Sequence, residues 1–135
     1  MNPSDDLVTT LSTEEAWAFL AGEEIGRLAY RLADEVHITP VNFAVVDGRL
    51  VFRTAEGSKL LGVMMHKNVA LEVDEFDRIR ATSVIVRGTA RHLRDVEADA
   101  LADIALYPWV ATEKYEFVSI EVEEITGRSF RLERG

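Results

Sequence analysis

The chain has 135 residues, 47% of them hydrophobic and 29% charged, and its formal net charge is -9 at pH 7. This length fits one compact domain, so residues 1–135 are expected to form a single domain, and the acidic balance argues against unspecific binding to nucleic acid or anionic lipid. The absence of cysteine excludes disulfides, thiolate metal sites and a cysteine nucleophile.

The amino-terminal residues predict a loose lead-in followed by a short helix. Residues 1–6 lack the basic region and apolar core of a signal peptide, and no apolar run approaches the length of a membrane span, so we expect a cytoplasmic protein. Ser12 and Glu15 have the spacing of a capping box, in which each side chain accepts a hydrogen bond from the other residue's backbone N–H. We expect the helix to end near Gly22 and to cover an open end of a barrel.

Alternating apolar residues then predict a series of strands. Asp47-Gly48 is a strong signal for a two-residue hairpin turn. Pro40 is expected at a bend or an unpaired edge position because proline has no N–H to donate, and Gly88 at a bulge or a close backbone approach. The expected strands span residues 25–32, 36–46, 50–54, 69–74, 83–91 and 115–125, with a short seventh at 129–132.

The segments between these strands are assigned to loops and helices. Residues 75–80 are polar and predict a loop, and Gly127 is expected to break the last long strand. Helices are expected at 58–66 and from residue 95 to 107, where a proline follows. Antiparallel strands without βαβ alternation predict a small closed β-barrel rather than a dinucleotide-binding fold.

Basic and hydroxyl side chains gather where the third strand is expected to lead into a helix. They are Arg53, Thr54, Ser58 and Lys59. Helix-start N–H groups, hydroxyls and a nearby cation together suit a phosphate group. An isolated pair of basic residues is more often simply solvated, and this alternative stays open for Arg53 and Lys59.

Other polar residues show no such convergence. The three histidines lack the spacing of a metal site, so no metal ion is expected. Glu72 and Asp74 alternate with apolar neighbours and are expected on the outer strand face. We do not expect them to form an acid–base pair, because nothing else in the sequence converges on them.

Short motifs follow one another in a fixed order over nearly the whole chain. They are Glu14-Glu15-Ala16-Trp17, Gly26-Arg27-Leu28-Ala29, Pro40-Val41-Asn42-Phe43, residues 52–60, residues 69–74, residues 83–90, Pro108-Trp109 and residues 125–128. This ordered set resembles the flavin-binding split-barrel family, the pyridoxamine 5′-phosphate oxidase-like proteins. The resemblance implies a mainly β fold, a six- to seven-stranded antiparallel split β-barrel with short peripheral helices. It also implies a homodimer with flavin mononucleotide (FMN) at the subunit interface.

The resemblance also implies roles for individual residues. Thr54, Ser58 and Lys59 resemble the phosphate-side group, with Arg53 beside it or under the ring. In the family, one strand lies along the flavin ring and its backbone amides meet the polar edge of the ring. The residues of this chain that resemble that strand are Pro40, Val41, Asn42 and Phe43. Ser83 and Arg87 resemble residues that a neighbouring strand contributes to the flavin site. Trp109 resembles a residue that reaches the flavin of the partner subunit.

The function implied is an FMN-dependent oxidoreductase, in which a nicotinamide donor reduces the flavin and a small molecule reoxidises it. This scheme requires no protein side chain as acid or base. Two alternatives stay open, a non-catalytic flavin- or heme-binding module and a deazaflavin-dependent reductase on the same barrel. Residues 128–135 lack the Arg-x-His substrate clamp of true pyridoxamine phosphate oxidases, so we do not expect vitamin B6 oxidation.

Overall fold

The computed structural model describes residues 7–55, 68–94 and 115–132. Within them lie one helix and seven strands. The elements are β1 (Val8–Thr10), α2 (Thr13–Ala21), β2 (Ile25–Leu32), β3 (Glu35–Val46), β4 (Arg49–Ala55), β5 (Asn68–Phe76), β6 (Arg80–Leu93) and β7 (Tyr115–Arg131). The helices expected at 58–66 and 95–107 fall outside the described residues.

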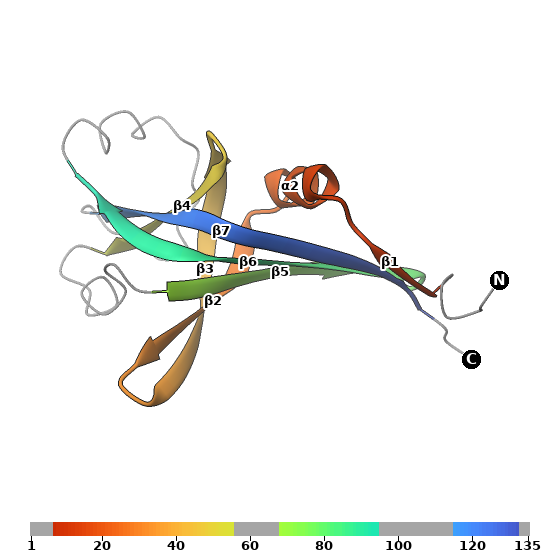
Figure 1. The fold of residues 1–135 in the computed structure, drawn as a ribbon, viewed down its shortest axis with the longest axis horizontal. Coiled ribbons are helices and arrows are strands. Elements are labelled where there is room, and N and C mark those ends of the chain that lie inside the picture. The colour runs from red at the N-terminus through yellow and green to blue at the C-terminus, as the bar shows by residue number, and fades with distance from the viewer. Residues whose placement is uncertain (1–6, 56–67, 95–114, 133–135) are drawn as a thin grey trace.

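Six of these strands close into a ring of antiparallel pairs (Figure 1). The order around the ring is β7, β4, β3, β2, β5 and β6, and β6 pairs back with β7. β1 joins from outside by pairing with the end of β7, where Val8 lies opposite Phe130. The expected mainly β split barrel is therefore confirmed.

The barrel interior is filled by one face of each strand, because successive side chains of a strand point to opposite sides. Leu28, Phe43, Leu71, Val86 and Ile120 are among these inward side chains, and each is at most 2% exposed. Helix α2 adds Ala16 and Leu20 to the same core. It contacts β3, β6 and β7 from different parts of the ring, as expected of a helix that covers an opening of the barrel.

Local sequence signals are confirmed where backbone chemistry dictates the conformation. Both hydrogen bonds of the Ser12–Glu15 capping box are present. Asp47 and Gly48 have φ angles of 49° and 75°, as a two-residue turn with left-handed central residues requires. Pro40 lies where β3 pairs with β2 and has no partner in β4. The β6–β7 register shifts at Gly88, and a Cβ there would overlap the backbone oxygen of Glu121.

Strand boundaries at both ends of the chain differ from the predicted ones. The lead-in contains β1, whose pairing partner lies more than a hundred residues away. Gly127 does not break β7, which runs on to Arg131 in place of a separate strand at 129–132. Gly127 pairs with Val84, and a Cβ on it would lie 2.9 Å from Leu11 Cδ1, so this glycine makes room for a packed side chain.

The loop expected at 75–80 is also shorter than predicted. Glu75 and Phe76 still belong to β5, where they pair with Thr82 and Ala81 of β6. The turn is fixed by Asp77, whose side chain accepts hydrogen bonds from the backbone N–H groups of Ile79 and Arg80. The predicted loop was too long because exposed strand residues near a hairpin turn can be polar, as residues of a loop are.

Candidate functional site

The outward-facing side chains of β3, β2, β5 and β6 form one continuous surface, here called the outer face. The strand register places Pro40 opposite Arg27, Arg27 opposite Glu72, and Asp74 opposite Ser83. Residues opposite each other in antiparallel strands project to the same side. Two residues expected to meet the flavin, Pro40 and Ser83, thus lie on one surface.

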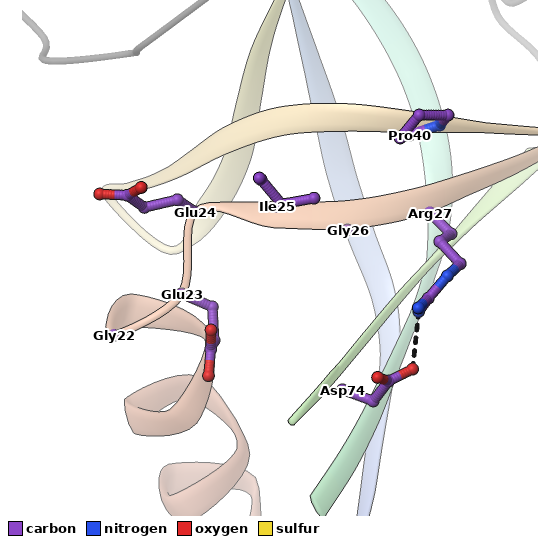
Figure 2. A pocket seen from close by; sticks show the side chains of 8 residues that line it. All are labelled: Gly22, Glu23, Glu24, Ile25, Gly26, Arg27, Pro40 and Asp74. Atoms are coloured by element: carbon purple, nitrogen blue, oxygen red, sulfur yellow. Dashed lines mark hydrogen bonds and ion pairs between the residues drawn. The ribbon is translucent and has the colours of Figure 1, made fainter. Parts of the chain in front are cut away.

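Arg27 is the centre of a polar network on the outer face. Its Nη1 lies 2.6 Å from Glu72 Oε1 and 2.6 Å from Asp74 Oδ2, and Figure 2 shows the contact with Asp74. Ser83 Oγ donates to Glu72 Oε2 at 3.2 Å. The outward position predicted for Glu72 and Asp74 is confirmed, but the prediction that nothing converges on them is wrong.

The two carboxyl groups of this network titrate differently. Burial, followed by the hydrogen bond and charge of Asp74, raises the pKa of Glu72. The hydrogen bond with Glu72, followed by Arg27, lowers the pKa of Asp74. Glu72 therefore retains a proton to higher pH, whereas Asp74 carries the negative charge that holds Arg27.

A pocket of about 490 Å³ opens beside this network. It is lined by Gly22, Glu23, Glu24, Ile25, Gly26, Arg27, Pro40 and Asp74, and we call it the Pro40 pocket (Figure 2). Its volume lies in the range of small-molecule sites, roughly 300–1,000 Å³. The turn after α2 is tied to β3 because Phe43 N donates to Glu24 O at 2.9 Å.

Glu23 gives the Pro40 pocket a group that titrates near neutral pH. Burial raises its pKa to about 7, and the hydrogen bond and charge of Glu75 contribute to the same effect. The side chain can therefore hold or release a proton under physiological conditions. No sequence pattern pointed to Glu23, because β5 brings Glu75 to it from a distant part of the chain.

The four residues expected along the flavin ring divide between two environments. Pro40 is exposed and Asn42 half-buried, whereas the side chains of Val41 and Phe43 belong to the barrel core at 8% and 2% exposure. Only backbone atoms of the two core residues could contact a ligand. The Phe43 N–H is already engaged by Glu24 O, as described above.

The structure describes only part of the expected phosphate group. Arg53 and Thr54 are successive residues of β4, so their side chains point to opposite sides of the strand. Thr54 lies opposite Glu116, whose Oε2 is 2.7 Å from His92 Nε2. Ser58, Lys59 and Trp109 lie outside the described residues.

A second pocket of about 330 Å³ lies further along β2 on the outer face. It is called the Arg31 pocket, and its lining comprises Ala29, Tyr30, Arg31, Val36, Asn68, Val69, Ala70, Arg87, Gly88 and Glu123. Arg87, another residue expected at the flavin, therefore belongs to this pocket. Its Nη1 lies 3.2 Å from Glu124 Oε1.

The described ranges contain neither a cluster of metal ligands nor a membrane-spanning helix. No group of three or more His, Asp or Glu side chains comes together there in a way that could hold a metal ion. Among the described residues, no helix is both long and apolar enough to cross a membrane.

The described barrel is the fold of flavin-binding split-barrel proteins, and comparison with known proteins assigns the family. A family model described as pyridoxamine 5′-phosphate oxidase matches residues 12–129, so the chain belongs to this family. It is also 36% identical over 127 residues to the uncharacterized protein Rv0080 of Mycobacterium tuberculosis, covering 89% of this chain and 84% of that protein.

Solved structures give the same assignment. A FAD binding protein from Mycobacterium smegmatis is 37% identical, with a TM-score of 0.82 over 92% of this chain and 99% of that one. A protein from Corynebacterium glutamicum, described as a putative pyridoxamine 5′-phosphate oxidase, is 40% identical. Its TM-score is 0.84, over 96% of this chain and 98% of that one.

Proposed function

We propose that this protein binds a flavin on the outer face and uses it to oxidise or reduce a small molecule. The observation that carries the proposal is the 37% identity, over 92% of the chain, to a protein described as FAD binding. The sequence resemblance implied FMN instead. FMN is contained within FAD, so the proposed site recognises the part that both cofactors share.

The outer face suits the flavin ring in its position and size. Pro40 and Arg27 line a pocket of about 490 Å³, and Ser83 is joined to Arg27 through Glu72. Arg53, Thr54, Ser58 and Lys59 are proposed to hold the phosphate that follows the ring, by charge and hydrogen bonding. Trp109 is proposed to reach the flavin of the partner subunit.

A bound flavin supplies electron transfer between a nicotinamide donor and a small acceptor. The chain supplies orientation and a controlled environment for this chemistry. The Arg27 network fixes the polar edge of the Pro40 pocket, and Glu23, whose pKa is raised to about 7, lines the same pocket. These groups are placed to bind and orient a substrate beside the ring.

We also propose that two copies form a homodimer with the flavin between them. Apolar side chains on the outer face support this, because Ile25, Val36 and Ile38 are 43%, 69% and 68% exposed. Apolar groups gathered on an exposed surface commonly mark an interaction site. A second copy placed there would cover them and enclose the flavin.

The phosphate assignment is tested by changing Lys59 to alanine. Loss of a charge-assisted contact should weaken FMN binding by an order of magnitude or more, worth roughly 1.5–3 kcal/mol. Isothermal titration calorimetry of the flavin-free protein measures this. Lys67→Ala, which removes the same charge eight residues further on, serves as the matched control. Equal FMN affinities for the wild type and Lys59→Ala would remove Lys59 from the site.

A further inference from the structure

A row of polar residues crosses three strands at one end of the barrel, where β4 and β6 end and β7 begins. The β4–β7 register places Thr54 opposite Glu116. The β6–β7 register ends with Leu93 opposite Phe117. Arg94 follows Leu93 directly, so it lies at the level of Glu116. Thr54, proposed above as a phosphate ligand, therefore shares this end of the barrel with an arginine that no sequence pattern marked.

Arg94, His92 and Glu116 form a chain of hydrogen bonds. Arg94 Nε donates to His92 Nδ1 at 2.9 Å, and His92 Nε2 lies 2.7 Å from Glu116 Oε2. A guanidinium has donors only, so Nδ1 must accept, and the neutral imidazole carries its proton on Nε2. His92 therefore donates to Glu116. Its side chain is only 11% exposed, so the surrounding barrel also holds the ring in place.

This chain of hydrogen bonds leaves the terminal nitrogens of Arg94 available. A direct ion pair with Glu116 would occupy the guanidinium, but His92 lies between the two charged groups. Arg94 is exposed, and no described residue is a partner of its two Nη atoms. Because only Nε is fixed, both Nη groups can donate together to the oxygens of an anion.

The anion proposed for this end of the barrel is the flavin phosphate. β4 brings its proposed ligand Thr54 beside β3, the strand proposed to lie along the flavin ring. One strand, β7, separates Thr54 from Arg94, so their backbones are roughly 10 Å apart. A threonine hydroxyl and an extended arginine can both reach a phosphate between them. Glu116 lies on the intervening strand, and its carboxylate is engaged by His92.

We propose that Arg94 binds the flavin phosphate together with Thr54, and that His92 is a positioning residue that orients Arg94. The inference rests on the proposed flavin site and adds two residues to it. His92 and Glu116 do not touch the flavin. They order the guanidinium in advance, which lowers the entropy cost of binding. The protein should therefore prefer flavins that carry a phosphate to riboflavin, which has none.

The test compares FMN with riboflavin on the flavin-free, full-length protein by isothermal titration calorimetry. The two ligands share the ring system and differ by the phosphate. The wild type should bind FMN more tightly, and Arg94→Ala should weaken FMN binding about tenfold while leaving riboflavin binding within about twofold. Arg78→Ala is the matched control and should change neither affinity, because Arg78 is also exposed and precedes β6, whereas Arg94 follows it.

Variants of His92 test its positioning role. His92→Gln keeps a carbonyl that can accept from Arg94 and an N–H that can donate to Glu116, so it should keep most of the preference for FMN. His92→Ala should weaken FMN binding several-fold, and should have no further effect when Arg94 is already alanine. A merely structural role of His92 predicts the same loss in both backgrounds, which would overturn the positioning role.

The outcomes separate this inference from the function on which it rests. Unchanged FMN affinity in Arg94→Ala would overturn the inference and leave the flavin site intact. An equal loss for FMN and riboflavin would overturn it too, since the effect would not depend on the phosphate. Failure of the wild type to bind either flavin would overturn the proposed function and, with it, this inference. Retained riboflavin binding also shows that the variants are folded.

Discussion

Arg27 shows how a single residue connects parts of the outer face that the sequence keeps apart. It bridges Glu72 and Asp74 at 2.6 Å each, and Ser83 reaches the same network through Glu72. A charged residue at an outward strand position is ordinary in a sequence. Its role depends on the pairing of β2 with β5, which joins residues more than forty positions apart.

Glu23 predicts a dependence of stability on pH. Its pKa is raised in the folded protein to about 7, so the native state binds its proton more tightly than the unfolded state does. This contribution to the free energy of unfolding is complete below about pH 4.5 and is lost as the pH rises through 7. Chemical denaturation between pH 5 and 8 should show a smaller decline for Glu23→Gln than for the wild type.

A neighbouring substitution controls for the loss of one negative charge. Glu24→Gln removes a carboxylate from the same pocket, and because Glu24 contributes least to the raised pKa of Glu23, this variant should keep most of the pH dependence of the wild type. A Glu23→Gln variant whose stability declines with pH as steeply as the wild type would contradict the assignment.

Gly88 predicts a steric effect at the bulge of β6. A Cβ at this position would overlap Glu121 O and lie 3.0 Å from Ile120 Cγ2, so Gly88→Ala should lower the free energy of unfolding by about 1–3 kcal/mol. Gly22→Ala is the matched control, because its Cβ would meet only Phe19 O at 3.7 Å. Urea denaturation of both variants measures the difference, and equal stability would show that the bulge tolerates a side chain.

At the scale of elements, α2 depends on its amino-terminal cap. Ser12 accepts a hydrogen bond from Glu15 N at 3.1 Å, and the helix it starts buries Ala16 and Leu20 in the barrel. Ser12→Ala should therefore reduce the free energy of unfolding by about 1 kcal/mol, measured by thermal or urea denaturation. Ser12→Asp can still cap the helix and should lose much less. Equal losses in both variants would show that the cap is not the cause.

The sequence predicts those elements whose cause is local. The turn at Asp47-Gly48 and the cap at Ser12 follow from the backbone chemistry of a few adjacent residues. The strand β1 and the continuation of β7 through Gly127 could not be predicted in this way. Both depend on contacts with distant residues. Val8 of β1 pairs with Phe130, and Gly127 of β7 packs against Leu11.

The same distinction holds for the candidate site. Alternation along each strand predicts that Pro40 and Ser83 face outward, and the resemblance marks both as flavin contacts. Neither source predicts that Arg27 lies between them, or that Glu75 raises the pKa of Glu23. Those arrangements follow from the order of strands around the ring, β3, β2, β5 and β6.

At the scale of the whole molecule, the closed ring gives each strand an inward face and an outward face with different roles. Inward side chains form the core, and outward ones are left for ligands and partners. The acidic charge of the chain makes the arginines of the outer face stand out as anchors for an anionic cofactor.

The most direct test of this account is a visible absorption spectrum of the purified protein. It should be recorded before and after incubation with excess FMN or FAD and removal of the unbound fraction. The account predicts a retained two-banded flavin spectrum that a nicotinamide donor bleaches. A retained spectrum that no donor bleaches would reduce the protein to a flavin-binding module. No retained flavin of either kind would contradict the central claim.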